Sequence, residues 1–149
     1  MVEFSLNVKE MRVGVERNFL VTLVRNADGT AVATYRLPEP VEHQKKVFVG
    51  PGWIQSLEKN AGHGKRLMEE VWKVFGAGAH LLGMKVYHHP WPYTTASMKW
   101  TDELGYKKVK GSLLLREKVF EPLPSASEEH REAAKIIFGG LLAPERKRG

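Results

Sequence analysis

The chain has 149 residues, of which 42% are hydrophobic and 27% are charged, a balance typical of a globular protein with a buried core. It contains no cysteine, which excludes disulfides, a thiolate nucleophile and cysteine-ligated metals, and it has no apolar run long enough for a transmembrane helix. The net charge of +6 favours an anionic partner, whether nucleic acid, a polyphosphate cofactor or an acidic surface, or it serves only solubility.

The length fits a single domain, which we place at residues 1–143, followed by a polar and basic tail at 144–149. The first residues do not combine a basic segment with an apolar one, so we expect no signal peptide and a cytoplasmic protein. We expect no metal site, because His88 and His89 are adjacent, their side chains point apart, and no further ligands stand out.

Strand signals dominate the beginning of the chain. Residues 19–24 and 31–37 are rich in β-branched and apolar residues, and Asn26-Ala27-Asp28-Gly29 between them predicts a hairpin turn. The preceding segment, 4–15, is compatible with another strand or with a short helix.

A short strand is predicted at 46–49, and residues 53–57 resume it after a Gly-Pro-Gly interruption. From Lys65 onward the apolar residues recur at helical spacing, which predicts a helix. Gly76 and Gly78 are expected to close this helix.

A strand at 83–88 follows, and then a helix that Thr94 or Thr95 caps and that Gly105 ends. Two further strands are predicted at 107–109 and at 112–116. The order of elements combines antiparallel hairpins with one strand–loop–helix–strand crossover, so we expect an α+β fold with a mixed α/β sheet.

A last helix is predicted over residues 127–138. Ser125 and Ser127 compete as its N-terminal cap, and Glu128 gives Ser125 the spacing of a capping box. The residues that this helix is expected to bury are Ala133, Ile136 and Ile137.

Two glycines, Gly62 and Gly64, stand between the strand at 53–57 and the helix that starts at Lys65. Glycines at such a junction let main-chain N–H groups approach an anion, and a helix N-terminus adds free N–H groups and a positive dipole end. An ordinary strand-to-helix turn is the alternative. The Walker phosphate loop is excluded because Arg66 follows Lys65, and the dinucleotide fingerprint fails because its third glycine is missing.

The segment resembles the acyl-CoA-binding loop of the GCN5-related N-acetyltransferases (GNAT), written Q/R-x-x-G-x-G/A. Lys59 stands where that family has Gln or Arg, and Gly62 and Gly64 match its glycines. Leu104-Gly105-Tyr106 is similar to the Leu-Gly-Phe that the family has further along the chain. The resemblance covers roughly residues 15–118.

The resemblance implies a central, mostly antiparallel sheet of about six to seven strands, with helices on both faces. Two neighbouring strands, one before the glycine loop and one after its helix, would diverge to leave a V-shaped gap for acetyl-CoA. Main-chain N–H groups from Gly62 to Lys65 would hold the pyrophosphate. The implied cofactor-binding residues are Ile54, Gln55, Ser56 and Leu57 on the strand edge, and Lys59, Asn60, Ala61, Gly62, His63, Gly64, Lys65 and Arg66 in the loop.

The activity implied is direct transfer of an acetyl group from acetyl-CoA to a primary amine of an unidentified acceptor. A general acid would protonate the departing thiolate. Family members often use a tyrosine four residues before the Gly of the second motif, and this position is Thr101 here. Because a threonine hydroxyl is a poorer proton donor than a phenol, Tyr93 and Tyr87 are substitute candidates.

The amine must lose a proton before it attacks, so a general base is also needed. His88 and His89 end the strand beside the expected gap and are candidate bases, unless they serve only as hydrogen-bonding loop residues. Glu58, at the end of the other strand, is a further candidate or a surface carboxylate.

A second interpretation is a binding module, in which the same fold has lost catalysis and contacts nucleic acid or a protein partner through its basic surface. Thr101, His63 within the loop and the basic residues 146–148 favour it. The apolar residues at 136–138 and 141–142 could serve a homodimer.

Overall fold

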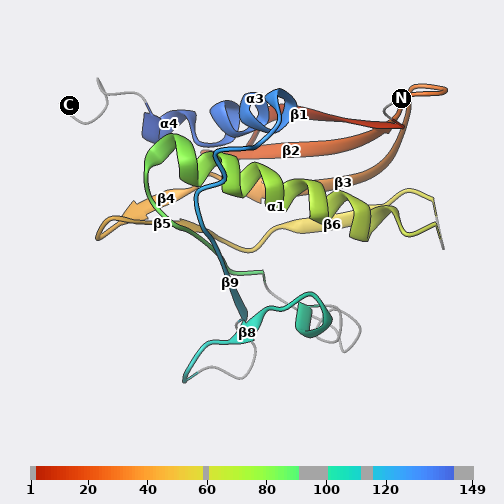
Figure 1. Ribbon diagram of the computed structural model, residues 1–149. Coiled ribbons are helices and arrows are strands. Elements are labelled where there is room, and N and C mark those ends of the chain that lie inside the picture. The colour runs from red at the N-terminus through yellow and green to blue at the C-terminus, as the bar shows by residue number, and fades with distance from the viewer. Residues whose placement is uncertain (1–2, 59–60, 91–100, 112–115, 143–149) are drawn as a thin grey trace.

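The computed structural model describes residues 3–58, 61–90, 101–111 and 116–142 (Figure 1). The expected tail at 144–149, the start of the helix at Thr94 or Thr95, and the strand residues 112–115 lie outside the described residues. The strands are β1 (Phe4–Val13), β2 (Glu16–Arg25), β3 (Thr30–Pro38), β4 (Val41–His43), β5 (Lys46–Val49), β6 (Trp53–Ser56), β7 (Val86–His88), β8 (Lys107–Lys108) and β9 (Arg116–Phe120). The helices are α1 (His63–Leu82), α3 (Glu128–Ile137) and α4 (Gly139–Leu142).

An antiparallel sheet in the order β1-β2-β3-β6 contains most of the N-terminal part of the chain. The predicted turn at 26–29 joins β2 to β3, and the segment before this hairpin is a strand, β1, that pairs with β2 along its whole length. Side chains of β2 and β3 alternate between the two faces of the sheet. Val21 and Tyr35 are buried on one face, whereas Thr22 and Thr34 are half-buried on the other.

A second sheet has the order β4-β5-β7-β9-β8. Only β5 and β7 run parallel, because β6 and α1 lie between them in the chain and return the backbone to the same end of the sheet. The remaining pairs are antiparallel. The α+β fold with one strand–loop–helix–strand crossover is therefore confirmed. The prediction that residues 53–57 resume the strand at 46–49 is wrong, because β6 joins the first sheet through β3.

The long helices pack together on one side of the first sheet (Figure 1). α1 contacts β2 and β3, while α3 contacts β1 and α1. We expected helices on both faces, and within the described residues α1 and α3 share the face that carries Phe19, Val21 and Leu23, all fully buried. No helix in the described part of the chain is both long enough and apolar enough to cross a bilayer.

α1 does not end at Gly76 and Gly78 as expected, but continues to Leu82 and ends at Gly83 in the left-handed conformation. The two glycines instead permit close packing. A Cβ at Gly76 would lie 2.9 Å from the Leu123 side chain, and one at Gly78 would lie 2.4 Å from the Phe138 ring. Their role is to admit the C-terminal segment against the helix.

The C-terminal elements follow the predicted order with shifted bounds. β9 starts at Arg116, where the predicted strand was to end, and continues to Phe120. Ser127 caps α3, because its Oγ accepts a hydrogen bond from the His130 N–H at 3.2 Å. Ser125 is therefore not the N-cap of α3.

The apolar residues suggested for a homodimer contact are mostly internal. Ile137 and Phe138 belong to the core, and Leu141 packs against it. Ile136, which was expected to be buried with Ala133, is 43% exposed. In the described residues Ile136 is thus the exposed member of the segment 136–138.

The close contact at Gly78 makes a stability prediction. Gly78→Ala should lower the free energy of unfolding by about 1–3 kcal/mol, because the added methyl group would overlap the buried Phe138 ring. Gly139→Ala is the matched control, since no atom of the residues that the structure describes lies within 4 Å of a Cβ at Gly139. Urea denaturation of both variants would measure the difference, and equal stabilities would contradict the packing role.

Candidate functional site

The two sheets separate after Val49. β5 and β7 are paired up to Val49 and His88, and the His89 N–H donates to the Val49 carbonyl oxygen at 2.9 Å. The chain then crosses the ring of Tyr35, where a Cβ at Gly52 would lie 2.5 Å from the ring. Only glycine allows this passage, which carries the backbone from β5 to the edge of the first sheet. The divergence of β6 from β7 corresponds to the V-shaped arrangement that the resemblance implied.

The four residues predicted to form the strand edge lie at the start of this diverging segment. β6 is the last strand of its sheet, so its second edge has no strand partner among the described residues. Ile54 points toward the start of α1, since its Cδ1 lies 3.7 Å from a Cβ built at Gly64. Gln55 lies on the opposite face, Ser56 Oγ donates to the Glu58 carbonyl oxygen, and Leu57 is 46% exposed.

The glycine loop leads directly into α1. Gly62 is the N-cap in the left-handed conformation (φ 71°), without a side-chain cap, and the first turn has no acidic residue. Arg66 is the first residue whose N–H bonds within the helix, to the Gly62 carbonyl oxygen. The N–H groups of His63, Gly64 and Lys65 therefore have no acceptor in the helix and suit an anion.

Space at the two glycines is consistent with a bound phosphate. Among the described residues, no atom lies within 4 Å of a Cβ built at Gly62, and Ile54 alone approaches one at Gly64. Lys65 and Ala61 are exposed, and no ion-pair partner of Lys65 lies in the described part of the chain. Lys59 and Asn60 lie outside the described residues.

Charged residues bracket the loop. Arg25 of β2 donates two hydrogen bonds to Glu58, at 2.8 and 3.0 Å, and also pairs with Asp28. Glu58 in turn contacts His63 Nε2 at 2.9 Å. Arg25 first, and His63 second, lower the pKa of Glu58, and this effect makes Glu58 a weak proton acceptor.

His88 sits deep in the core, not in an open site. It is fully buried, and its Nε2 and Nδ1 lie 2.8 Å from Tyr35 Oη and 2.7 Å from Tyr106 Oη. Trp72 Nε1 donates a further hydrogen bond to Tyr106 at 2.8 Å. Burial lowers the pKa of His88 to about 3, with a smaller effect from His89, and it raises the pKa of both tyrosines. Such an environment does not suit a general base.

Of the candidate acids, the two that lie in the described residues, Thr101 and Tyr87, are not at exposed positions. Thr101 is 1% exposed, and its carbonyl oxygen accepts from the Tyr106 N–H at the helix end that Gly105 closes. Tyr93 lies outside the described residues. Tyr87 is half-buried beside Phe48, at a centroid distance of 5.4 Å.

His89 is placed differently from His88. Its Nε2 lies 2.7 Å from Glu117 Oε2, with side chains 20% and 34% exposed. Because β7 and β9 pair His88 with Lys118, the next position in the register brings His89 and Glu117 together. Sequence reasoning named His89 and missed Glu117, since no local pattern predicts which strand becomes the partner.

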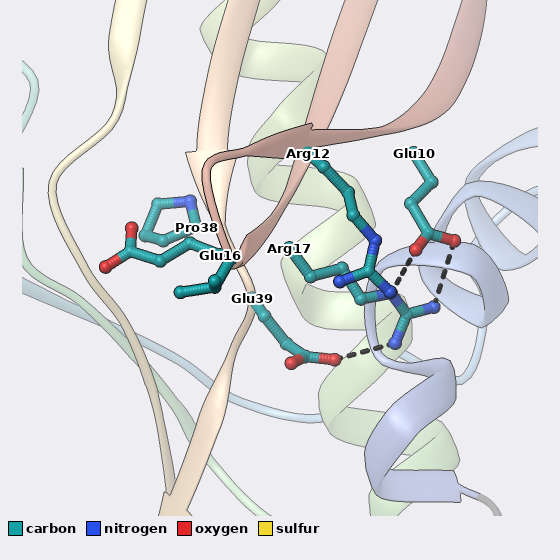
Figure 2. A pocket seen from close by; sticks show the side chains of 7 residues that line it. Glu10, Arg12, Glu16, Arg17, Pro38 and Glu39 are labelled. Atoms are coloured by element: carbon teal, nitrogen blue, oxygen red, sulfur yellow. Dashed lines mark hydrogen bonds and ion pairs between the residues drawn. The ribbon is translucent and has the colours of Figure 1, made fainter.

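A separate hollow of about 640 Å³ lies at the turn between β1 and β2 (Figure 2). Arg17 forms its wall and pairs at 2.7 Å with both Glu10 and Glu39. β1 has 10 residues, so this hollow is about 30 Å from Phe4, the residue at the other end that contacts His63. Its three glutamates also disfavour a phosphate.

The burial of His88 predicts acid sensitivity. The folded protein binds the His88 proton near pH 3 and the unfolded chain near 6.5, so this contribution to stability is complete above pH 6.5 and is lost as the pH falls toward 3. From pH 7 to pH 5 the wild type should lose about 2 kcal/mol more than His88→Gln, which keeps polar atoms without the titration. Urea denaturation at both pH values measures this, and parallel losses would contradict it.

Comparison with models of known protein families gave no match, and a search of curated protein sequences gave none either. Solved structures are similar. The KacTA–DNA complex has a TM-score of 0.52 at 15% identity, covering 85% of this chain and 76% of that one. A second similar structure is a tyrosine mutant of the AtaT toxin bound to the C-terminus of the antitoxin AtaR and acetyl-CoA. It has a TM-score of 0.52 at 14% identity, covering 81% of this chain and 72% of that one.

A third similar structure is a cAMP-binding acyltransferase from Mycobacterium smegmatis, with a TM-score of 0.52 at 16% identity. The alignment covers 88% of this chain and 42% of that protein, so the chain spans less than half of its length. Together with the divergence of β6 from β7, these similarities identify the architecture. The chain has the fold of the GCN5-related N-acetyltransferases.

Proposed function

We propose that this protein binds acetyl-CoA at the start of α1 and transfers the acetyl group to a primary amine. The observation that carries the proposal is the N-terminus of α1, which has no side-chain cap and begins at two glycines next to β6, the last strand of its sheet in the described part of the chain. The AtaT structure contains acetyl-CoA, which supports the choice of cofactor.

The chain offers two kinds of contact to such a cofactor. The N–H groups of His63, Gly64 and Lys65 would bind the pyrophosphate, with the Lys65 side chain, and Lys59 as predicted from the sequence, adding positive charge. The main chain of β6, on the side away from β3, would bond the pantetheine arm. When bound, acetyl-CoA supplies the acetyl group as an activated thioester.

His89 is the general base that we propose in place of the buried His88. With its Nε2 hydrogen donated to Glu117, the imidazole keeps Nδ1 as a proton acceptor. Its own main-chain N–H makes the last bond to β5, at the Val49 carbonyl oxygen, where the strands diverge. The carboxylate of Glu117 would stabilise the imidazolium that forms when the amine loses its proton. Tyr93 stays a prediction for the acid.

Cofactor binding is tested by filling the glycine loop. Calorimetry should detect binding of acetyl-CoA to the wild type, and Gly64→Glu should weaken it about 100-fold or more, because a carboxylate would occupy the anion site. Folding should persist, since a Cβ at Gly64 makes only an ordinary contact with Ile54. Gly139→Glu changes the charge equally at an open position and should bind normally. Absence of binding by the wild type would refute the cofactor assignment.

The base is tested by kinetics. With an amine that the wild type acetylates in a panel of polyamines, aminoglycosides and peptides, His89→Gln should lower kcat about 10²–10⁴-fold. The KM for acetyl-CoA should change little, because the imidazole is not proposed to hold the cofactor. Release of the free thiol measures the rate. His80→Gln, at an exposed position near the end of α1, is the control. Full activity of His89→Gln would exclude the assignment.

A further inference from the structure

His63 occupies an unusual position for a residue between two glycines of a phosphate loop. It is only 6% exposed, although Gly62 and Lys65 around it are exposed. Its ring packs edge-on against Phe4 of β1, at a centroid distance of 5.7 Å. The side chain therefore points into the protein, away from the N–H groups that face the expected anion.

Both ring nitrogens of His63 are engaged. Arg66 Nη1 lies 3.0 Å from Nδ1, and Glu58 Oε1 lies 2.9 Å from Nε2. A guanidinium can only donate, so Nδ1 must accept, and the ring proton is on Nε2, where it is donated to Glu58. The network fixes a neutral imidazole with one defined tautomer.

These bonds join the two ends of the loop. Glu58 follows β6, and His63 is the first residue of α1. Their contact, which we call the clasp, therefore connects the residue before the loop to the start of the helix. Arg25 holds Glu58 from β2 through two hydrogen bonds, and Asp28 holds Arg25 from the hairpin turn. The first sheet thereby sets where the loop begins and where the helix begins.

The same network accounts for Arg66. Its guanidinium lies 4.5 Å from the centroid of the Phe4 ring and bonds to His63. Arg66, one of the cofactor-binding residues that the resemblance implied, thus has its side chain turned onto β1. His63 holds it there.

We infer that His63 is the positioning residue of the phosphate loop. Its side chain connects the loop to the first sheet through Glu58, and it holds the Arg66 side chain in place. This inference rests on the proposed function for the identity of the ligand. The side chain of His63 does not itself contact the phosphates, although its main-chain N–H is among those proposed to bind them. It sets the geometry in which the N–H groups of Gly64 and Lys65 meet them.

The test compares three variants for binding of CoA by calorimetry. His63→Phe keeps a ring against Phe4 but loses both hydrogen bonds, and it should weaken binding about tenfold or more. His63→Gln can still donate to Glu58 and accept from Arg66, and it should restore most of the affinity. Binding of pantetheine, which lacks the diphosphate, should be unchanged in both.

A matched control exists in α3. His130 pairs through Nε2 with Glu70 at 2.8 Å and through Nδ1 with Ser127, and it is 8% exposed, much like His63. His130→Phe should cost comparable stability and leave CoA binding unchanged. If His63→Phe does not fold, Glu58→Ala opens the same clasp and should weaken CoA binding in the same way.

Amide hydrogen exchange separates the inference from the proposed function. Exchange at Arg66, the first N–H that is bonded within α1, should be faster in His63→Phe than in the wild type, slow again in His63→Gln, and unchanged in His130→Phe, whether or not CoA binds. If the wild type does not bind CoA but the variants show this exchange pattern, the cofactor assignment is refuted and the positioning role of His63 is retained. Equal exchange and equal CoA affinity in wild type and His63→Phe would overturn the inference.

Discussion

The contact between the backbone at Gly52 and the ring of Tyr35 decides how the rest of the site is arranged. It moves the chain from the second sheet to the first within a few residues, at a separation that no Cβ would permit. Tyr35 is itself fixed, because its hydroxyl bonds to His88 of β7. One tyrosine therefore holds both strands at the point where they part. The pairing of β6 with β3, and not with β7, follows this crossing.

The sequence predicted the local elements and not their partners. The hairpin at 26–29 and the glycine loop could be predicted because turn chemistry and helix periodicity are local signals. The Gly-Pro-Gly segment predicted a break between two strands, but no local pattern indicates that the second of them, β6, pairs with β3. Gly76 and Gly78 were misread as helix ends because the residues that pack on them, Leu123 and Phe138, are distant in the sequence.

The site residues show the same limit. The sequence alone could not show which of His88 and His89 is the better candidate base. Adjacent side chains at the end of β7 point to opposite faces, and the packing of α1 determines which face is buried. One imidazole consequently joins a core network of hydroxyls, while its neighbour meets a carboxylate near the surface. His63 adds a third arrangement, in which carboxylate and guanidinium bind opposite sides of the ring. Surroundings, and not residue type, separate their chemistry.

The close packing at Gly76 and Gly78 of α1 also bears on the order in which the fold is assembled. The atoms nearest to Gly76 and Gly78 belong to residues that follow the helix by dozens of positions, and Phe138 is fully buried there. Closing loops of that length costs conformational entropy before the contact repays it, so we expect this junction to form later than the β2–β3 hairpin. A chain still lacking α3 would leave α1 with an exposed groove. Cooperative folding of the domain thus waits for its C-terminal segment.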